Sequence, residues 1–360
     1  MQMRNNQKTE ITTASRDQWL REHGGIINVN KPAGLTSHDV VGRLRRLLSV
    51  RKVGHTGTLD PMATGVLPIC VGRATRIMEY LDMDRKTYRC TMRLGRTYDT
   101  QDVTGTVLSE AEESRIDLIR EEDVRKAFSV FQGVIWQLPP MYSARKVDGR
   151  KLYEYARNGQ GDQILEKVKP RQIYIWDLTI DDLSLGKGYD SEIAFSVTCS
   201  KGTYIRTICQ EAGERLGVGG AMASLVRNGT GGFVLEEAVD LAQLEEMSPE
   251  EICAIMKAPE DALTAFGRVH LSGPLDIRRI TTGLPVWTKH IQIVEEPAFK
   301  TEVFPLPIRE EFRRTYLAYA VPEDVFLGIV TMDEDGENIR ADKIFADGTG
   351  LLAGREGDRK

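Results

Sequence analysis

The sequence predicts an α+β protein built around a mixed or antiparallel sheet flanked by helices. Segments in which apolar and polar residues alternate are interleaved with segments in which apolar residues recur every three or four positions. These segments do not follow a strict β-α-β rhythm, which argues against a doubly wound parallel sheet. From about Val269 onward, short strands separated by turn residues replace the mixed pattern and predict a small β-rich second domain.

Strands are predicted from alternation and from short apolar runs bounded by turns. The cleanest alternation lies in residues 86–94, where Tyr88 and Cys90 share one face and Thr87 and Arg89 the other. A sheet with one buried and one solvated face gives this pattern. The other predicted strands are residues 26–29, 66–71, 193–199, 291–294, 316–320, 325–330 and 339–345.

Helices are predicted where the apolar period is that of an α-helix. After a turn at residues 30–34, Thr36 or Ser37 can cap a helix whose apolar stripe runs from Val40 to Leu48. Further helices are predicted in residues 74–81, 124–131 and 205–216, the last one after a turn at Lys201-Gly202.

The composition excludes several classes of protein. A chain of 360 residues with 41% hydrophobic and 28% charged residues is a globular protein of more than one domain, and no apolar run is long enough to cross a membrane. The N-terminal residues lack the apolar core of a secretory signal. The five cysteines form no C-x-x-C motif and the five histidines have no metal-finger spacing. We therefore expect reduced cysteines, no metal site and a cytoplasmic protein.

Composition shifts divide the chain into four parts. Residues 1–24 are polar and aperiodic and predict a flexible tail, and residues 349–360 predict a second tail. Residues 25–264 form the predicted first domain, which ends in an acidic helical stretch. Residues 265–348 form the predicted second domain.

The charge is segregated along the chain, although the net charge is −5. Residues 43–96 contain twelve Lys/Arg and four Asp/Glu, whereas residues 236–261 contain nine Asp/Glu and one Lys. Phosphate binding follows the local field, so the basic stretch is compatible with a nucleic-acid partner. On charge alone, two ordinary solvated faces are the favoured explanation of the pattern.

Asp60 is the most conspicuous candidate for chemistry. It lies in the glycine-rich segment 54–65, which is too rich in glycine and threonine for a regular element and too poor in lysine and glutamate for a linker. A carboxylate in such a structured loop can act as a nucleophile or a general base. The alternative is that Asp60-Pro61 simply begins a turn.

Four further side chains have both a functional and a structural interpretation. Tyr88 is either a packed core tyrosine or an aromatic platform for a nucleobase. Tyr204 and Arg206 open a helix and can form an anion site, or Arg206 is an ordinary surface residue. His55 is an acid–base or stacking group, or an ordinary loop histidine. The acids of residues 95–102 favour a turn at a strand end over a metal site.

Six stretches, taken in order, resemble the TruB family of tRNA pseudouridine synthases, over about residues 25–232. One of the six, which begins at Pro139, resembles the start of the family's thumb-like RNA-binding segment at about 139–170, and residues 265–348 loosely resemble a PUA-like module. Tyr98 and Arg145 depart from the family pattern, and residues 295–314 are extra relative to shorter members. The motifs are Lys31-Pro32-x-Gly34-x-Thr36-Ser37, the segment 54–65 around Asp60, Lys86-x-Tyr88, Pro139–Ala144, Cys199–Arg206 and Leu225-x-Arg227.

The resemblance implies an activity and roles for named residues. The family isomerises a tRNA uridine, in the T loop at position 55, without a cofactor or metal, after flipping the nucleotide out of its stack. Asp60 would act at C1′ or C2′ of the ribose, with Arg206 keeping it charged and Tyr88 stacking on the base. The resemblance also implies six substrate-binding residues: Lys31, which braces the catalytic loop or a phosphate, His55, which fills the vacated stack, the walls Tyr204 and Leu225, and Asp102 and Lys146.

Other functions stay open on the sequence alone. One is the catalytic subunit of a guide-RNA-dependent pseudouridine synthase, and another is a tRNA-folding or RNA-binding protein with incidental synthase activity. A metal-dependent hydrolase is the most distant. In the favoured interpretation the partner is the T arm of tRNA, no membrane is involved, and the protein acts as a monomer.

Overall fold

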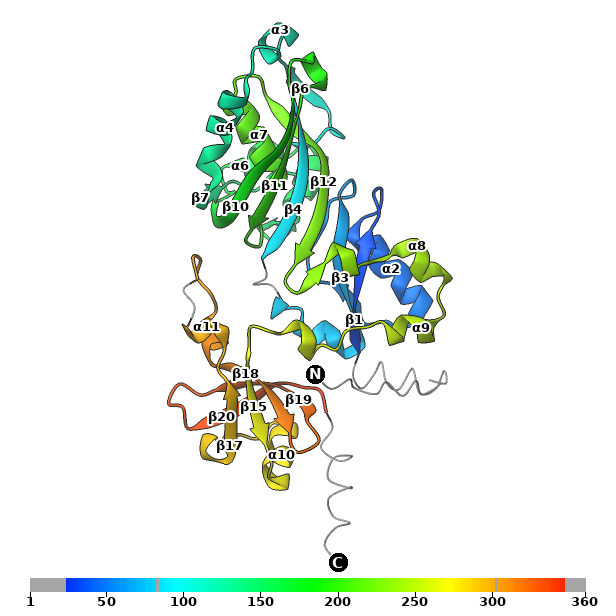
Figure 1. Cartoon of the computed structure of the whole chain (residues 1–360), viewed down its shortest axis with the longest axis vertical. Helices are drawn as coiled ribbons and strands as arrows, with labels where there is room; N and C mark the ends of the chain where they lie inside the picture. The colour runs from blue at the N-terminus through cyan, green and yellow to red at the C-terminus, as the bar shows by residue number, and fades with distance from the viewer. Residues whose placement is uncertain (1–23, 82–84, 302–303, 347–360) are drawn as a thin grey trace, which may run out of the picture.

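A large mixed sheet dominates the computed structural model of the chain, which describes residues 24–81, 85–301 and 304–346 (Figure 1). Eight strands follow the order β14-β1-β3-β12-β4-β11-β10-β7, while β2 pairs with β3 and β13 with β12. Most neighbours are antiparallel, but β1–β14 and β3–β12 are parallel. The strands are β1 (Gly25–Lys31), β2 (Val53–His55), β3 (Thr64–Val71), β4 (Lys86–Leu94), β7 (Gly133–Gln137), β10 (Arg171–Ser184), β11 (Glu192–Cys199), β12 (Gly220–Thr230), β13 (Phe233–Val234) and β14 (Val239–Asp240).

Helices pack on both halves of this sheet. In Figure 1, α4 lies beside β10 and α8 beside β1, while α7 packs on β12 and β4 and α2 packs on β2. Two short hairpins form separate two-stranded sheets. One pairs β5 (Arg96–Tyr98) with β6 (Val107–Glu110), and the other pairs β8 (Lys146–Val147) with β9 (Arg150–Lys151). The helices of this part are α2 (Ser37–Leu48), α3 (Glu113–Ile116), α4 (Glu121–Phe128), α5 (Leu152–Arg157), α6 (Gly161–Leu165), α7 (Ile205–Arg215), α8 (Leu241–Glu246) and α9 (Pro249–Ala254).

A second, six-stranded sheet follows, in the order β16-β20-β19-β18-β15-β17. The mixed first sheet and the β-rich second one confirm the predicted α+β class. The predicted domain boundary at residues 264/265 remains a prediction. Apart from Gly24, the predicted tails lie outside the described residues, and so do residues 347–348 of the predicted second domain. The elements are β15 (Gly267–Leu271), α10 (Pro274–Thr281), β16 (Val286–Trp287), β17 (Ile291–Glu295), α11 (Ala298–Thr301), β18 (Thr315–Ala320), β19 (Val325–Met332) and β20 (Asn338–Ile344).

Helix α2 begins and ends as its sequence predicts. Thr36, rather than Ser37, is the N-cap: its hydroxyl accepts from the Asp39 amide, and the Asp39 carboxylate accepts from the Thr36 amide. This reciprocal capping satisfies amides that would otherwise lack partners at the helix start. Val40 and Leu44 are buried on the predicted stripe, so α2 is fixed against the sheet next to the Asp60 loop.

Three predicted elements were wrong in extent or type. The strand at residues 26–29 continues to Lys31, because its last residues still pair with β3. The loop predicted over 54–65 is shorter, since β2 includes His55 and pairs with β3. The helix predicted at 74–81 is a 3₁₀ helix at Gly72–Ile77, whose three-residue repeat places Ala74 and Ile77 on the same buried side.

The two sheets share one apolar cluster. Tyr80, after the 3₁₀ helix at Gly72–Ile77, packs edge-on against Phe266 and stacks on Phe312. Its hydroxyl donates to Asp342 of β20, and Arg73 and Arg76 donate to the carbonyls of Phe345 and Ile344. Residues 295–314, the stretch extra to shorter family members, contribute Phe299 and Phe312 to this cluster.

The described core agrees with two expectations from composition. All five cysteines are buried and free of disulfides. In the part of the chain that the structure describes, no helix is both long enough and apolar enough to cross a membrane.

Candidate active site

The loop that carries Asp60 is held from several sides. Ser37, at the start of α2, accepts from the Leu59 amide at 2.9 Å and donates to the Leu59 carbonyl at 3.2 Å. Leu59 itself is buried in the main core. Beyond Asp60, the Gly34 amide donates to the Pro61 carbonyl at 2.8 Å. The flanking residues are therefore fixed, and the Asp60 side chain is presented from a rigid loop.

Asp60 forms a forked ion pair with Arg206. The Arg206 Nε lies 2.9 Å from Oδ2 of Asp60, and its Nη2 donates to Oδ1 at 3.1 Å. The Arg206 side chain is 6% exposed and that of Asp60 32%, so the carboxylate stays reachable while its partner is buried. Burial raises the pKa of Asp60 above its ordinary value, and the Arg206 guanidinium opposes that shift by favouring the charged form.

Arg206 is in turn fixed by carbonyl groups from two other segments. Its Nη1 donates to the Thr100 carbonyl at 2.8 Å, and its Nη2 donates to the Tyr142 carbonyl at 3.0 Å. Asp102 lies 4.0 Å from Nη1. Since the planar guanidinium has a fixed fork of donors, these contacts leave one orientation in which it faces Asp60.

The N-terminus of α7 is clamped by a side chain from β7. Tyr204 is the residue before the helix, and its amide donates to the Gln137 Oε1 at 2.7 Å while its carbonyl accepts from the Gln137 Nε2 at 2.9 Å. The preceding turn depends on Gly202, whose φ of 74° lies in the left-handed region that glycine adopts more easily than other residues. This clamp sets where Arg206, in the first turn of α7, can reach.

Tyr88 and Leu225 lie on the core-facing side of the central strands. Tyr88 is on β4 and Leu225 on the neighbouring β12, and both are more than nine-tenths buried in the main apolar cluster. Tyr88 is close enough to Asp60 for their charges to interact. The sequence pattern predicted this buried face, and the structure brings the tyrosine and the carboxylate to one site.

The Lys31 side chain is inaccessible to solvent and lies against the Asp60 loop. This position supports the expected bracing of the loop, and the role of Lys31 stays a prediction. Its Nζ donates to the carbonyls of Pro32 at 2.8 Å, Leu35 at 2.6 Å and Pro61 at 3.2 Å. Burial lowers the pKa of Lys31 to about 8, against the opposing attraction of Asp60.

The remaining predicted residues lie at different distances from this centre. His55, on β2, is half-buried; burial lowers its pKa, and its Nδ1 is buried without a hydrogen-bond partner among the described residues. Asp102 is buried and accepts from the hydroxyls of Thr100 and Thr104, so it organises the turn after β5. Lys146 is exposed on the β8 hairpin, away from the Asp60 loop.

Sequence reasoning gave Arg227 no role, although its side chain is almost completely buried beside the catalytic loop. Its Nε donates to the Val66 carbonyl at 2.6 Å and its Nη2 donates to the Gly57 carbonyl at 3.2 Å. One signal was available: along a strand, Arg227 shares a face with the apolar Leu225. Gln137 was missed too, because nothing local in the sequence marks a clamp 67 residues away.

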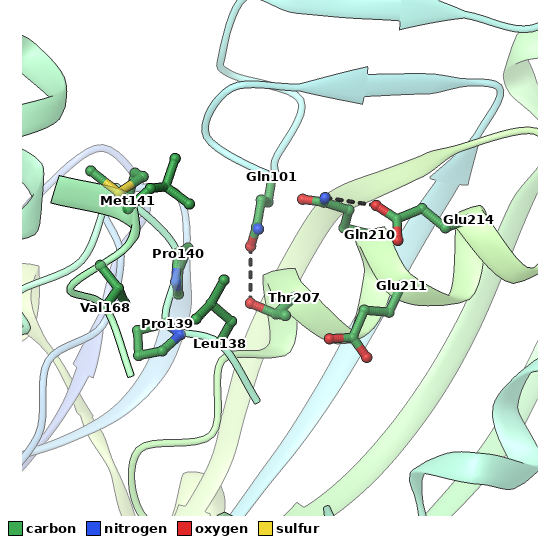
Figure 2. Close-up of a pocket in the computed structure, with 11 residues that line it drawn as sticks. Gln101, Leu138, Pro139, Pro140, Met141, Val168, Thr207, Gln210, Glu211 and Glu214 are labelled. Carbon is green, nitrogen blue, oxygen red and sulfur yellow. Dashed lines mark hydrogen bonds between the residues drawn. The ribbon is translucent and has the colours of Figure 1, made fainter. Parts of the chain in front are cut away.

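A cavity of about 290 Å³ opens beside the site, between the start of the thumb-like segment and α7. Figure 2 shows the apolar wall of Pro139, Pro140 and Met141 facing Thr207 and Glu211 of α7. Asp60 and Tyr88 do not line this cavity, so it is an adjoining space rather than the reaction site.

Comparisons with known proteins point to one family. The model of the TruB family pseudouridylate synthase (N terminal domain) matches residues 45–205, and that of the tRNA pseudouridylate synthase B C-terminal domain matches residues 206–264. The tRNA pseudouridine synthase B of Syntrophotalea carbinolica is 43% identical over 72% of this chain and 81% of that protein. That of Clostridium perfringens is 37% identical over 87% of this chain and 96% of that protein.

Among solved structures, a Cbf5-Nop10-Gar1 complex contains a chain of the same fold. Its TM-score is 0.65 at 21% sequence identity, covering 96% of this chain and 92% of that chain. This likeness concerns the fold alone: a large mixed sheet with helices, followed by a β half-barrel that agrees with the predicted PUA-like part.

Proposed function

Because the chain belongs to the TruB family and is a pseudouridine synthase, an isomerase, we propose that it converts the T-loop uridine at position 55 of tRNA to pseudouridine. The catalytic carboxylate in this proposal is Asp60. The observation that carries the assignment is the forked ion pair with the buried Arg206, which supports a charged carboxylate on a rigid loop.

The reaction needs a carboxylate at the sugar and a held base. Asp60 attacks C1′ or removes the C2′ proton, and the bond between C1′ and N1 breaks with its electron pair on N1 of the uracil. The base turns and C5 bonds to C1′. In the first route the bond between Asp60 and C1′ breaks with its electron pair returning to the carboxylate, and in the second the proton returns from Asp60 to C2′. The C5 proton then leaves and N1 takes up a proton. Substrate and product have the same atoms, so the isomerisation requires no oxidant or reductant.

The side chains around Asp60 match the other demands of this chemistry. Tyr88 stacks on the detached base and takes part in removing the C5 proton, while Leu225 and Tyr204 form apolar walls. His55 props the position that the flipped nucleotide leaves. Lys146 and the basic residues between 43 and 96 contact tRNA phosphates.

Pseudouridine mapping on a T-arm hairpin tests this function, using the purified chain alone and its Asp60→Asn variant. We expect wild type to form pseudouridine at one position without any guide RNA and in the presence of EDTA. Absence of product until a guide RNA is added would identify the guide-dependent alternative. Residual activity of Asp60→Asn above a few per cent would contradict the role given to Asp60.

The same variant separates an enzyme from a tRNA-folding protein. If Asp60→Asn still assists tRNA folding as well as wild type, a folding activity exists beside the synthase. If folding assistance is absent from both proteins, the synthase activity is the function.

A further inference from the structure

Arg227 stands where three parts of the candidate site meet. On β12 it lies opposite Tyr88 of β4 in the antiparallel register and opposite Gly65 of β3 in the parallel one. Its guanidinium lies close enough to the Tyr88 side chain to oppose the rise in the Tyr88 pKa, and it donates to the Gly57 carbonyl in the catalytic loop. A single side chain therefore links the loop of Asp60 to Tyr88.

We propose that Arg227 is a positioning residue for the proposed reaction, which holds the Tyr88 oxygen ready to accept the C5 proton and fixes the catalytic loop at Gly57. This inference rests on the proposed function. In the step concerned, C5 has already bonded to C1′. The C5–H bond breaks, its proton passes to the ionised oxygen of Tyr88, its electron pair restores the C5–C6 double bond, and N1 takes up one proton.

The electrostatic surroundings of Tyr88 support this role. Burial raises the pKa of Tyr88, and the nearby Cys199 and Asp60 add to the rise, whereas the Arg227 guanidinium opposes it. Arginine stays charged at any pH at which the protein folds, so its effect on the phenol oxygen is constant. Arg227 therefore offsets part of the cost of ionising Tyr88.

Packing alone does not account for Arg227. Taking a guanidinium out of water is expensive, and apolar residues of similar volume often stabilise a core as well or better. Arg227 also lies near two other groups that carry positive charge when protonated, Lys31 and His55, and it opposes protonation of both. A charge kept at such a position indicates a requirement for that charge beside Tyr88 and for the hydrogen bond to Gly57.

Two glycines lie close to Arg227. A Cβ at Gly65 would collide with the Arg227 backbone, and one at Gly57 would lie 3.4 Å from the Arg227 Nη1. Gly65 therefore lets β3 approach β12 closely at Arg227, whereas a side chain at Gly57 would meet the guanidinium at an ordinary van der Waals distance.

The test compares wild type with Arg227→Met on a T-arm hairpin that carries uridine or 5-deuterouridine at the target. We expect kcat to fall roughly 10- to 100-fold, the size expected for loss of a hydrogen bond to a charged group. The affinity for the hairpin should change less than about twofold, because Arg227 is buried and does not reach RNA. The deuterium isotope effect on kcat should rise, since proton removal from C5 becomes slower than the other steps.

Arg115→Met is the matched control, because it also removes a guanidinium bonded to a carbonyl, that of Gly217 at 2.9 Å, but far from Tyr88. It should leave kcat and the isotope effect unchanged. An unchanged isotope effect in Arg227→Met, or a loss of affinity as large as the loss of kcat, overturns the proposal.

A second variant covers a failure of Arg227→Met to fold. Arg227→Lys keeps the charge, and it is combined with Tyr88→Phe in a double-mutant cycle. The two effects on kcat should be strongly non-additive if Arg227 acts through Tyr88, and additive effects overturn the proposal. If wild type itself forms no pseudouridine, the proposed function fails, which this design distinguishes from failure of the Arg227 role.

Discussion

The catalytic loop and the thumb-like segment differ in how they are attached to the protein. Residues 56–63 are short and are bonded to groups from β1, α2 and β12, through Lys31, Ser37 and Arg227. Residues 139–170 instead pack around a small core of their own, formed by Leu152, Ile164 and Val168. The loop is therefore fixed by contacts with several elements of the first sheet and its helices, whereas the thumb-like segment is a small unit with its own core.

This difference matches two physical demands. Chemistry at a ribose carbon needs a carboxylate held within a fraction of an ångström, which requires many fixed contacts. Binding of a phosphate backbone needs exposed cations along a surface, and it tolerates looser attachment. The two regions are linked through Arg206 of α7, which donates both to Asp60 and to the Tyr142 carbonyl.

The largest expected effect is that of Asp60→Asn. We expect kcat to fall at least about 100-fold, because the amide can neither attack C1′ nor remove the C2′ proton. Hairpin affinity should stay within about threefold of wild type, since phosphates supply most of the binding energy. Gel-shift and single-turnover assays measure both, and a parallel loss of binding would show that the loop also anchors RNA.

Tyr88→Phe is expected to have the next largest effect. The ring is kept and can still stack on the base, but the oxygen that takes the C5 proton is lost. We expect kcat to fall about 10- to 100-fold with unchanged hairpin affinity. Tyr88→Leu serves as the comparison, because it also removes the stacking ring and should be slower still. Equal rates for the two variants would contradict a role for the ring, and a wild-type rate for Tyr88→Phe would contradict a role for the oxygen.

Lys31→Met tests how firmly the catalytic loop is attached, through the pH dependence of the free energy of unfolding. The native state releases the Lys31 proton near pH 8, whereas the unfolded chain keeps it to about 10.5. Between these values the unfolded state binds more protons, so this group makes the free energy of unfolding rise with pH. Urea unfolding at pH 7.5 and 9.5 should therefore show a larger wild-type advantage at pH 9.5. A pH-independent difference would mean that the lysine titrates normally.

The smallest effect is expected for Lys146→Ala in the thumb-like segment. This exposed side chain contacts at most one phosphate, so hairpin affinity should fall about two- to fivefold and the salt dependence should become slightly shallower. The value of kcat should not change. A fall in kcat would mean that the thumb-like segment acts on the chemistry and not only on binding.

Much of this fold follows from local pattern, because a strand or helix must place its apolar face on the core. Residues 86–94 form β4 with the predicted buried face, and Thr36 caps α2 as one of two predicted candidates. The 3₁₀ helix at Gly72–Ile77 was read as an α-helix, because the apolar spacing of three residues fits both. Its exact type depends on contacts with the second sheet.

The site was only partly readable from the sequence. Asp60 stands out because a lone acid in a glycine-rich loop is unusual. Tyr88 and Arg206 were also candidates from the sequence, and the resemblance added their roles. The burial of Lys31 and Arg227 was harder to predict, because a positively charged side chain is normally exposed. Along β1, Lys31 lies on the same side of the strand as Ile27 and Val29, and along β12 Arg227 lies on the same side as Leu225. The alternation of side chains along a strand therefore puts both cations in the core. Their partners are backbone carbonyls, which no residue pattern reveals.

The apolar cluster shared by the two sheets has a consequence for unfolding. Tyr80 of the first part and Phe266, Phe299 and Phe312 of the second bury one another's rings, so neither sheet can come apart without exposing the other's aromatic surface. Heating should therefore produce a single melting transition in place of two.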